Sequence, residues 1–238
     1  MIENQNLVEV KNLKKYFNIT TGMFSSKPLK ALTGDTHYHT IIAPSEKALQ
    51  MILQELQEKL GKLQCPVVRF SSSTPLPLEI GYRTPGTLGS DRIAAAVGAW
   101  NEAPGRNLLI IDAGTAITVD FVGKDGKYNG GNIAPGIKMR LRALHEYTSR
   151  LPMVDKEGDT PAIGYDTETA IRSGVINGIC HEIEGYINEF KQKYCDLLVF
   201  LTGGDEKPLK NRIKNCIFAD KYLVAKGLNR ILTDYGNK

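Results

Sequence analysis

The chain has 238 residues, 42% of them hydrophobic and 24% charged, which is enough apolar chain to bury a large core without metal or disulfide support. Its 30 basic and 26 acidic residues are interspersed and leave a formal net charge of +4, a balance that favours small anionic ligands and gives no reason to expect nucleic acid. The four widely spaced cysteines form no Cys-x-x-Cys pair and so indicate no zinc site, and without a long apolar run we expect a cytoplasmic protein with neither signal peptide nor membrane span.

The sequence pattern of the amino-terminal part predicts short strands and a helix that packs on a sheet. Residues 7–43 contain short β-rich runs and turns, and residues 45–63 carry apolar side chains at helical spacing after a capping serine. Another β-rich run covers residues 65–70. The stretch 71–92 is rich in proline, glycine and serine, which cannot sustain a regular element, and loops of this length are usually functional or disordered.

A helix predicted over residues 91–100 contains several alanines and a glycine, which would permit close packing against a neighbouring element. Residues 101–107 have the composition of a hinge. We therefore expect two lobes, an amino-terminal one of residues 1–104 and a carboxyl-terminal one of residues 105–238.

The second lobe opens with a buried strand at residues 108–112, which turns back into a strand at 116–122 before an Asp-Gly turn. The glycine-rich stretch 128–136 is expected to be a loop. The elements predicted after it are a helix at 137–148, a helix at 168–194, a buried strand at 196–205 and a helix at 223–232. Gly174 and Gly178 lie one turn apart in the second element, which suggests close contact with another helix.

The motif Asp-Ala-Gly-Thr-Ala-Ile-Thr at residues 112–118 places an acidic residue at the end of a buried strand and a Gly-Thr pair in the turn that follows. Gly114 lets backbone N–H groups approach phosphate oxygens, and the Thr115 hydroxyl adds a donor. The Asp112 carboxylate can hold a cation that offsets phosphate charge. The alternative is an ordinary hairpin with a turn-forming Asp-x-Gly.

The motif Leu-Thr-Gly-Gly-Asp at residues 201–205 is a second place where a buried strand meets glycines. Gly203 and Gly204 would let a flat ring or a ribose lie against the backbone. The structural alternative is that a strand-to-helix turn needs glycine for its positive φ regardless of any ligand.

The motif Gly-Ser-Asp-Arg at residues 89–92 begins the helix that follows the proline-rich loop. The helix N-terminus favours an anion, Arg92 can form a bidentate pair with a carboxylate, and Asp91 can accept a proton. The structural alternative is that Asp91 only caps the helix and that Arg92 is solvated.

In their order and spacing, these motifs resemble the type III pantothenate kinases. The matching series is Gly-x-Asp-Arg, Asp-x-Gly-Thr-Ala-x-Thr, Gly-x-x-x-Pro-Gly at 131–136, Gly-x-x-Thr at 164–167 and Thr-Gly-Gly, and it runs from about residue 77 to the carboxyl end. The resemblance implies an α/β protein of the actin-like ATPase (ribonuclease H-like) superfold, with two lobes that each contain a mixed sheet and flanking helices. Nucleotide would bind between the lobes.

The resemblance also implies residue roles. Asp91 corresponds to the catalytic proton acceptor and Asp112 to the ligand of a monovalent cation. The implied pantothenate contacts are Tyr82, Gly89, Ser90, Asp91, Arg92 and Thr167, and the implied ATP-binding residues are Gly114, Thr115, Gly203 and Gly204. The implied reaction is the ATP-dependent phosphorylation of pantothenate, the first step of coenzyme A biosynthesis, carried out by a homodimer with magnesium and with potassium or ammonium.

One element of the family is missing from the sequence. Type III kinases open with an Asp-x-Gly-Asn-Thr turn that cradles the ATP phosphates and helps to bind magnesium, and this sequence contains no such motif. By comparison with the family, the chain begins about one hairpin late. The accounts we consider are a misplaced start codon or shortened chain, a degenerate kinase that binds without turnover, and another segment that substitutes in space; the first is preferred because every later motif is present.

Two other functions stay open from the sequence alone. One is a non-catalytic module that binds pantothenate or nucleotide, or a transcription accessory protein of the same family. The other is a sugar or acid kinase of the same superfold. Product formation from pantothenate and ATP separates the kinase from the binding module, and a substrate panel separates it from the other kinases.

Overall fold

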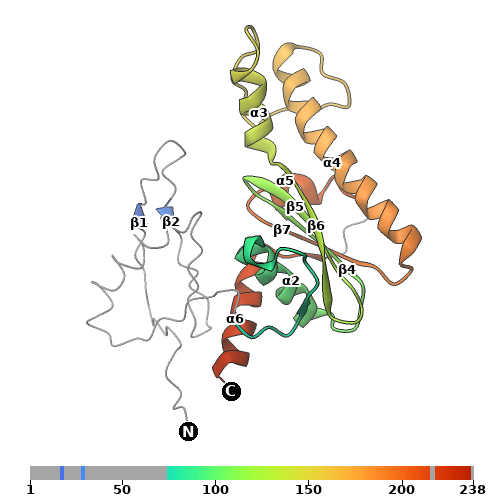
Figure 1. Cartoon of the computed structure of the whole chain (residues 1–238). Helices are drawn as coiled ribbons and strands as arrows, with labels where there is room; N and C mark the ends of the chain where they lie inside the picture. The colour runs from blue at the N-terminus through green and yellow to red at the C-terminus, as the bar shows by residue number, and fades with distance from the viewer. Residues whose placement is uncertain (1–16, 19–27, 30–73, 215–217, 237–238) are drawn as a thin grey trace. The chain divides into compact units, whose positions relative to one another are not determined.

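The computed structural model describes residues 17–18, 28–29, 74–214 and 218–236 (Figure 1). The helix expected at 45–63 and the strand expected at 65–70 lie outside these residues. Within the first predicted β-rich region, β1 (Phe17–Asn18) pairs with β2 (Pro28–Leu29) in an antiparallel ladder.

A six-stranded mixed sheet holds the rest of the described chain together. Its strands are β3 (Glu79–Ile80), β4 (Leu108–Ala113), β5 (Ala116–Val122), β6 (Lys127–Pro135), β7 (Leu198–Thr202) and β8 (Phe218–Ala219), and their order across the sheet is β3-β6-β5-β4-β7-β8. The ladders β4–β5 and β5–β6 are antiparallel, whereas β3–β6, β4–β7 and β7–β8 are parallel. The predicted strands at 108–112 and 116–122 and the α/β fold class are therefore confirmed.

The strand β6 corrects one prediction, because residues 128–136 were expected to be a loop. Most of this stretch pairs along β5, and the ladder is irregular where Phe121 and Val122 meet it. Gly130 has a φ of +119° at this irregularity, and a Cβ at Gly131 would collide with the Val119 carbonyl of β5. The glycines therefore serve a strand that bends and approaches its neighbour closely.

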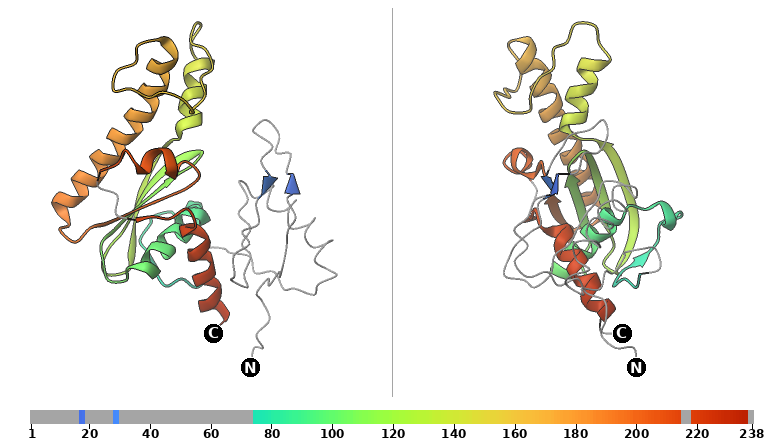
Figure 2. Two further views of the ribbon diagram at one scale, coloured as in Figure 1. Left: turned by 180° about the vertical axis from the view of Figure 1, so that it is seen from behind. Right: turned by 90° about the vertical axis from the view of Figure 1, so that its left-hand side faces the viewer.

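Helices cover both faces of the sheet. They are α2 (Ser90–Glu102), α3 (Ile137–Glu146), α4 (Thr167–Lys193), α5 (Glu206–Lys210) and α6 (Leu223–Gly236), and a short 3-10 helix covers Pro85–Thr87. Figures 1 and 2 show α3 and α4 on one side of the sheet and α2 on the other. On the first side, the strand residues Leu109, Ile111 and Val119 belong to one core with Ile176 and Ile179 of α4.

The small residues of α2 allow the close packing that the sequence predicts. A Cβ added at Gly98 would collide with the Leu223 carbonyl at the start of α6, and one added at Gly227 would collide with the Ala94 carbonyl. The similar prediction for α4 is wrong within the described chain, because a Cβ at Gly174 or Gly178 would meet nothing within 4 Å.

The chain divides into two compact units, one of residues 76–227 and one of residues 1–75 with 228–238. The sheet from β3 to β8 and the helices α2 to α5 belong to the first of these units. The lobe boundary expected between residues 104 and 105 stays a prediction, because most of the amino-terminal lobe lies outside the described residues. Among the described helices, none combines the length and the apolar character that a membrane crossing requires.

Candidate active site

The Gly-Ser-Asp-Arg motif forms the first turn of α2. Gly89 is the N-cap and Ser90 the first helical residue, and the exposed Asp91 side chain accepts a hydrogen bond at Oδ1 from the Arg92 amide at 2.8 Å. A Cβ at Gly89 would lie 2.5 Å from this same oxygen. Glycine is therefore required at residue 89 for the Asp91 carboxylate to keep its position at the helix start.

Arg92 is neither solvated nor unpaired, in contrast to the structural alternative considered for this motif. Its side chain is buried, and it donates to Asp120 of β5 from Nε at 3.0 Å and from Nη2 at 2.5 Å. The Tyr128 hydroxyl of β6 also donates to Asp120, at 2.6 Å. Burial lowers the pKa of Arg92, but the hydrogen bond and the charge of Asp120 raise it overall, so the guanidinium is firmly cationic.

Tyr82 joins this cluster from the loop that precedes α2. Its ring packs edge-on against Tyr128, with 6.3 Å between ring centroids, and the Arg92 guanidinium carbon lies 5.8 Å from the Tyr82 centroid. The structure thus brings together Tyr82 and the 89–92 motif, which are neighbours in sequence, through two residues that the sequence reading missed. Asp120 could have been noticed in the sequence as an isolated charge inside an apolar strand. Tyr128 carries no such signal.

Asp112, the second-last residue of β4, lies between two threonines of the neighbouring strands. In the sheet register it is paired with Thr118 of β5 and with Thr202 of β7. Both threonine hydroxyl oxygens are buried and have no hydrogen-bond partner. A buried hydroxyl without a partner is unfavourable, so two of them beside a carboxylate indicate room for a ligand that supplies the missing interactions.

The charge environment of Asp112 links it to the Asp91 motif. Burial, followed by the negative charges of Asp91 and Asp120, raises the pKa of Asp112 to about 6. The carboxylates of Asp91 and Asp112 therefore lie within electrostatic reach of each other, although 21 positions separate them in the sequence. Electrostatic effects on pKa of this kind gather at functional sites.

The glycine turns of the motifs at residues 112–118 and 201–205 lie beside Asp112. Gly203 has a φ of +99°, and a Cβ there would collide with the Asp112 Oδ1 and the Ala113 carbonyl. The Asp205 amide donates to the same Ala113 carbonyl at 2.8 Å. Gly203 is thus required by the backbone itself, whereas Gly204 adjoins open space, since a Cβ there would meet nothing within 4 Å.

The turn at Gly114 and Thr115 also contacts the loop that leads into α3. The Gly136 amide, at the N-cap of α3, donates to the Thr115 carbonyl at 3.0 Å. The Thr115 side chain is exposed. This places an exposed hydroxyl, a glycine turn and a helix N-terminus in one small region of the surface, which is a suitable environment for a phosphate group.

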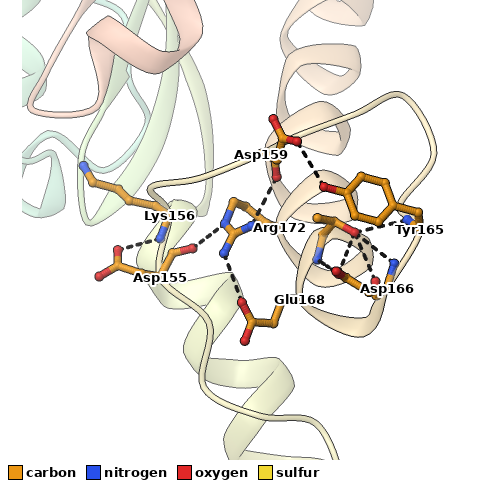
Figure 3. Close-up of polar contacts among 8 residues, drawn as sticks. Asp155, Lys156, Asp159, Tyr165, Asp166, Glu168 and Arg172 are labelled. Carbon is orange, nitrogen blue, oxygen red and sulfur yellow. Dashed lines mark hydrogen bonds and ion pairs between the residues drawn. The ribbon is translucent and has the colours of Figure 1, made fainter.

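A polar network holds the segment between α3 and α4 (Figure 3). The buried Arg172 of α4 donates to the backbone carbonyls of Asp155 and Asp159, at 2.9 and 3.2 Å, and pairs with Glu168. One residue further along, Lys156 forms an ion pair of 2.5 Å with the buried Asp205 of the Thr-Gly-Gly-Asp turn. The segment is therefore tied both to α4 and to the end of β7.

Thr167 is not brought to the Asp91 cluster within this chain. It is the exposed first residue of α4, after the N-cap Asp166, whose side chain accepts a hydrogen bond from the Thr169 amide. Figure 1 shows this end of α4 beside α3, in the helical pair that extends beyond the sheet.

A cavity of about 620 Å³ lies elsewhere on the molecule. Its lining includes Phe121, Phe190 and Tyr194 and asparagines of β6, and none of the predicted site residues. Within the described part of the chain, no three His, Cys, Asp or Glu side chains are grouped so that they could hold a metal ion. Any cation beside Asp112 would therefore rely on hydroxyl and carbonyl oxygens in addition to carboxylate.

Comparison with known proteins identifies the family of the chain. The family model described as type III pantothenate kinase matches residues 2–189. A type III pantothenate kinase of Bacteroides fragilis is 54% identical over 195 residues, which cover 80% of each chain. One of Cytophaga hutchinsonii is 38% identical over 220 residues, or 90% of this chain and 94% of that protein.

Among solved structures, a Campylobacter jejuni protein described as a Baf family transcriptional activator is similar in fold. Its TM-score is 0.53 at 25% sequence identity, and the match covers 78% of this chain and 80% of that one. The mixed sheet with helices on both faces agrees with the actin-like ATPase superfold that the motifs imply. On the match of the family model and the identity to these kinases, the chain belongs to the type III pantothenate kinase family.

Proposed function

We infer that this protein is a kinase that transfers the γ-phosphoryl group of ATP to the primary hydroxyl of pantothenate, the reaction that begins coenzyme A biosynthesis. Family membership supports the reaction. The observation that carries the assignment to this site is that the charge of the exposed Asp91 carboxylate raises the pKa of the partly buried Asp112 carboxylate. We place the enzyme in the cytoplasm.

The pantothenate side of the site is assigned to Tyr82 and to residues 89–92. Phosphoryl transfer to an alcohol needs an acceptor for the hydroxyl proton, and the exposed Asp91 at the start of α2 can take this role. Arg92 supplies positive charge for the pantothenate carboxylate, and Tyr82 supplies an aromatic surface beside it. Gly89 and Ser90, at the start of α2, provide backbone groups that can contact pantothenate.

The nucleotide side is assigned to the two glycine turns. Gly114 and Thr115 present a backbone turn and a hydroxyl to the phosphates, and Gly203 and Gly204 offer a surface for the nucleoside. The open space beside Gly204 and the exposed Thr115 side chain support this placement. Magnesium would enter with ATP.

A monovalent cation, potassium or ammonium, fits between Asp112, Thr118 and Thr202. Potassium accepts hydroxyl and carbonyl oxygens as ligands, and two buried hydroxyl oxygens without partners flank this carboxylate. When bound, such a cation would offset negative charge on the nucleotide phosphates. It would also neutralise a carboxylate whose ionisation is disfavoured by burial.

We further propose that the protein acts as a homodimer in which α3, α4 and the segment between them take part in the interface. This part of the chain exposes large apolar side chains, of which Tyr147 is 85% exposed and Ile163 84% exposed. A dimer would also give Thr167 a substrate to contact, by reaching the site of the partner subunit. Sedimentation should give twice the chain mass, and Ile163→Glu should shift it towards the monomer.

The reaction is tested by incubating the protein with ATP and pantothenate and following ADP and phosphopantothenate together. Both products should form in equal amounts, and faster with potassium or ammonium than with sodium. Calorimetric binding of pantothenate without product would instead identify the non-catalytic module. Turnover of another acid or sugar but not of pantothenate would identify a different kinase.

A further inference from the structure

Asp120 is a fully buried carboxylate in the middle of a sheet, where a charge is costly unless its partners compensate for it. It pairs with Arg92, and it accepts a hydrogen bond from Tyr128. Replacing such a buried pair by apolar side chains is often neutral or stabilising in proteins, so stability alone does not account for it. Its contacts with Arg92 and Tyr128 indicate a second role, which is to orient the side chains around it.

The geometry of the pair fixes the plane of the Arg92 guanidinium. Asp120 accepts from Nε and from Nη2, so two adjacent corners of the planar group are held at once. Asp120 does not accept from Nη1, and the Tyr82 side chain is a further hydrogen-bond partner of the guanidinium. An arginine held in this way is already oriented before substrate arrives, which lowers the entropy cost of binding.

Tyr128 links Asp120 to Tyr82 and so helps to fix the position of the Tyr82 ring. Its hydroxyl fixes one side of the Asp120 carboxylate, and its ring packs edge-on against Tyr82. The Tyr82 ring in turn lies next to the Arg92 guanidinium. Both residues assigned to the body and carboxylate of pantothenate are therefore held by one buried pair on β5 and β6, which is not among the residues assigned to either substrate.

We propose that Asp120 and Tyr128 are positioning residues that orient Arg92 and Tyr82 for pantothenate and so set the affinity for this substrate, but not for ATP. The proposal rests on the proposed function, because it needs pantothenate to bind beside Arg92. A merely structural pair would lower stability without distinguishing the two substrates. The separation of the two KM values therefore decides between these roles.

The test compares Tyr128→Phe, Asp120→Asn and the matched control Asp196→Asn. Asp196 also pairs with an arginine, Arg106, which lies just before the start of β4, but the side chains of this pair are 35% and 46% exposed. For each protein, KM is measured for pantothenate and for ATP, pantothenate binding is measured by calorimetry, and the melting temperature is recorded. Tyr128→Phe removes one hydrogen bond and keeps the ring, so it stays informative if Asp120→Asn fails to fold.

We expect Tyr128→Phe to raise the pantothenate KM and Kd by roughly 3- to 10-fold, because Tyr128 acts on Arg92 only through Asp120. Asp120→Asn should raise them by roughly 10- to 100-fold, because it removes the ion pair with Arg92 itself. The ATP KM should stay within about 2-fold for Tyr128→Phe, which keeps the Asp120 charge, and Asp196→Asn should change neither constant. Asp120→Asn also removes a negative charge that acts on Asp112, so its effect on the pantothenate KM should exceed its effect on the ATP KM. Equal changes in both KM values, or a lower melting temperature with unchanged pantothenate binding, would overturn the proposal. A wild-type protein that neither binds nor phosphorylates pantothenate would overturn the proposed function itself.

Discussion

Asp91 and Asp112 belong to one electrostatic site. Asp112 ends a central strand, Asp91 begins a helix on one face of the sheet, and after burial the charge of Asp91 is the next contribution that raises the pKa of Asp112 to about 6. A phosphoryl-transfer site needs a proton acceptor near the alcohol and charge compensation near the phosphates. We propose that Asp91 performs the first of these tasks and Asp112, with its cation, the second.

Gly89→Ala should lower kcat by about 100-fold, because small displacements of a catalytic group have effects of this size. The added Cβ would lie 2.5 Å from Asp91 Oδ1, and its backbone angles are accessible to alanine, so the carboxylate must move rather than the helix. Steady-state kinetics with pantothenate and ATP measure the effect. Gly86→Ala is the matched control, since its Cβ would meet nothing within 4 Å, and equal rates for the two variants would contradict the prediction.

Asp112→Asn should change how stability depends on pH. The folded-state pKa of Asp112 is about 6, above the ordinary value of 3.8, so the folded protein holds this proton more tightly than the unfolded chain does. Its contribution to stability is present below about pH 4 and is lost as pH rises through 6. As pH rises from about 4 through 6, the free energy of unfolding of the variant should therefore increase relative to that of the wild type. Without a cation the difference should reach up to about 3 kcal/mol.

The same variant tests the cation site without an activity assay. Potassium should raise the melting temperature of the wild type more at pH 8 than at pH 5, because it binds the ionised carboxylate. Asp112→Asn should lose most of this difference. An identical response to potassium in the two proteins, measured against sodium at equal ionic strength, would show that the cation binds elsewhere.

Gly174→Ala should stabilise the protein by about 0.5–1 kcal/mol, because alanine is the better helix former and the position is exposed in α4 with space for a Cβ. Thermal unfolding should show a rise of roughly 1–4 °C. Gly203→Ala should lower the melting temperature, since φ there is +99° and a Cβ would collide with Asp112. A lower melting temperature for Gly174→Ala would mean that this face of α4 is covered.

The elements with strong hydrophobic periodicity could be predicted from the sequence. The strand pair 108–112 and 116–122 and the helix at 168–194 match β4, β5 and α4 to within a residue at each end. Their apolar patterns are local, and each is bounded by turn residues. β6 was missed because its glycines resemble a loop, and only pairing with β5 makes it a strand.

The site could be predicted in its motifs but not in its connections. Gly89, Asp91 and Asp112 stand out because they belong to an ordered series of motifs that resembles one family, although each motif alone also has a structural explanation. The partner of Arg92 is 28 residues away on another strand, and the unpaired hydroxyls of Thr118 and Thr202 depend on the register of three strands. Spatial proximity of this kind arises from the fold and leaves no spacing signal in one sequence.

The most direct measurement is the rate of phosphopantothenate formation by the wild type and by Asp91→Asn, with the pantothenate and ATP KM values determined for both. Asparagine keeps the size and the hydrogen bond of Asp91 but cannot accept the proton, so kcat should fall by roughly 100- to 10,000-fold with little change in either KM. A variant that keeps the wild-type kcat would contradict the assignment of Asp91 as the proton acceptor of a pantothenate kinase.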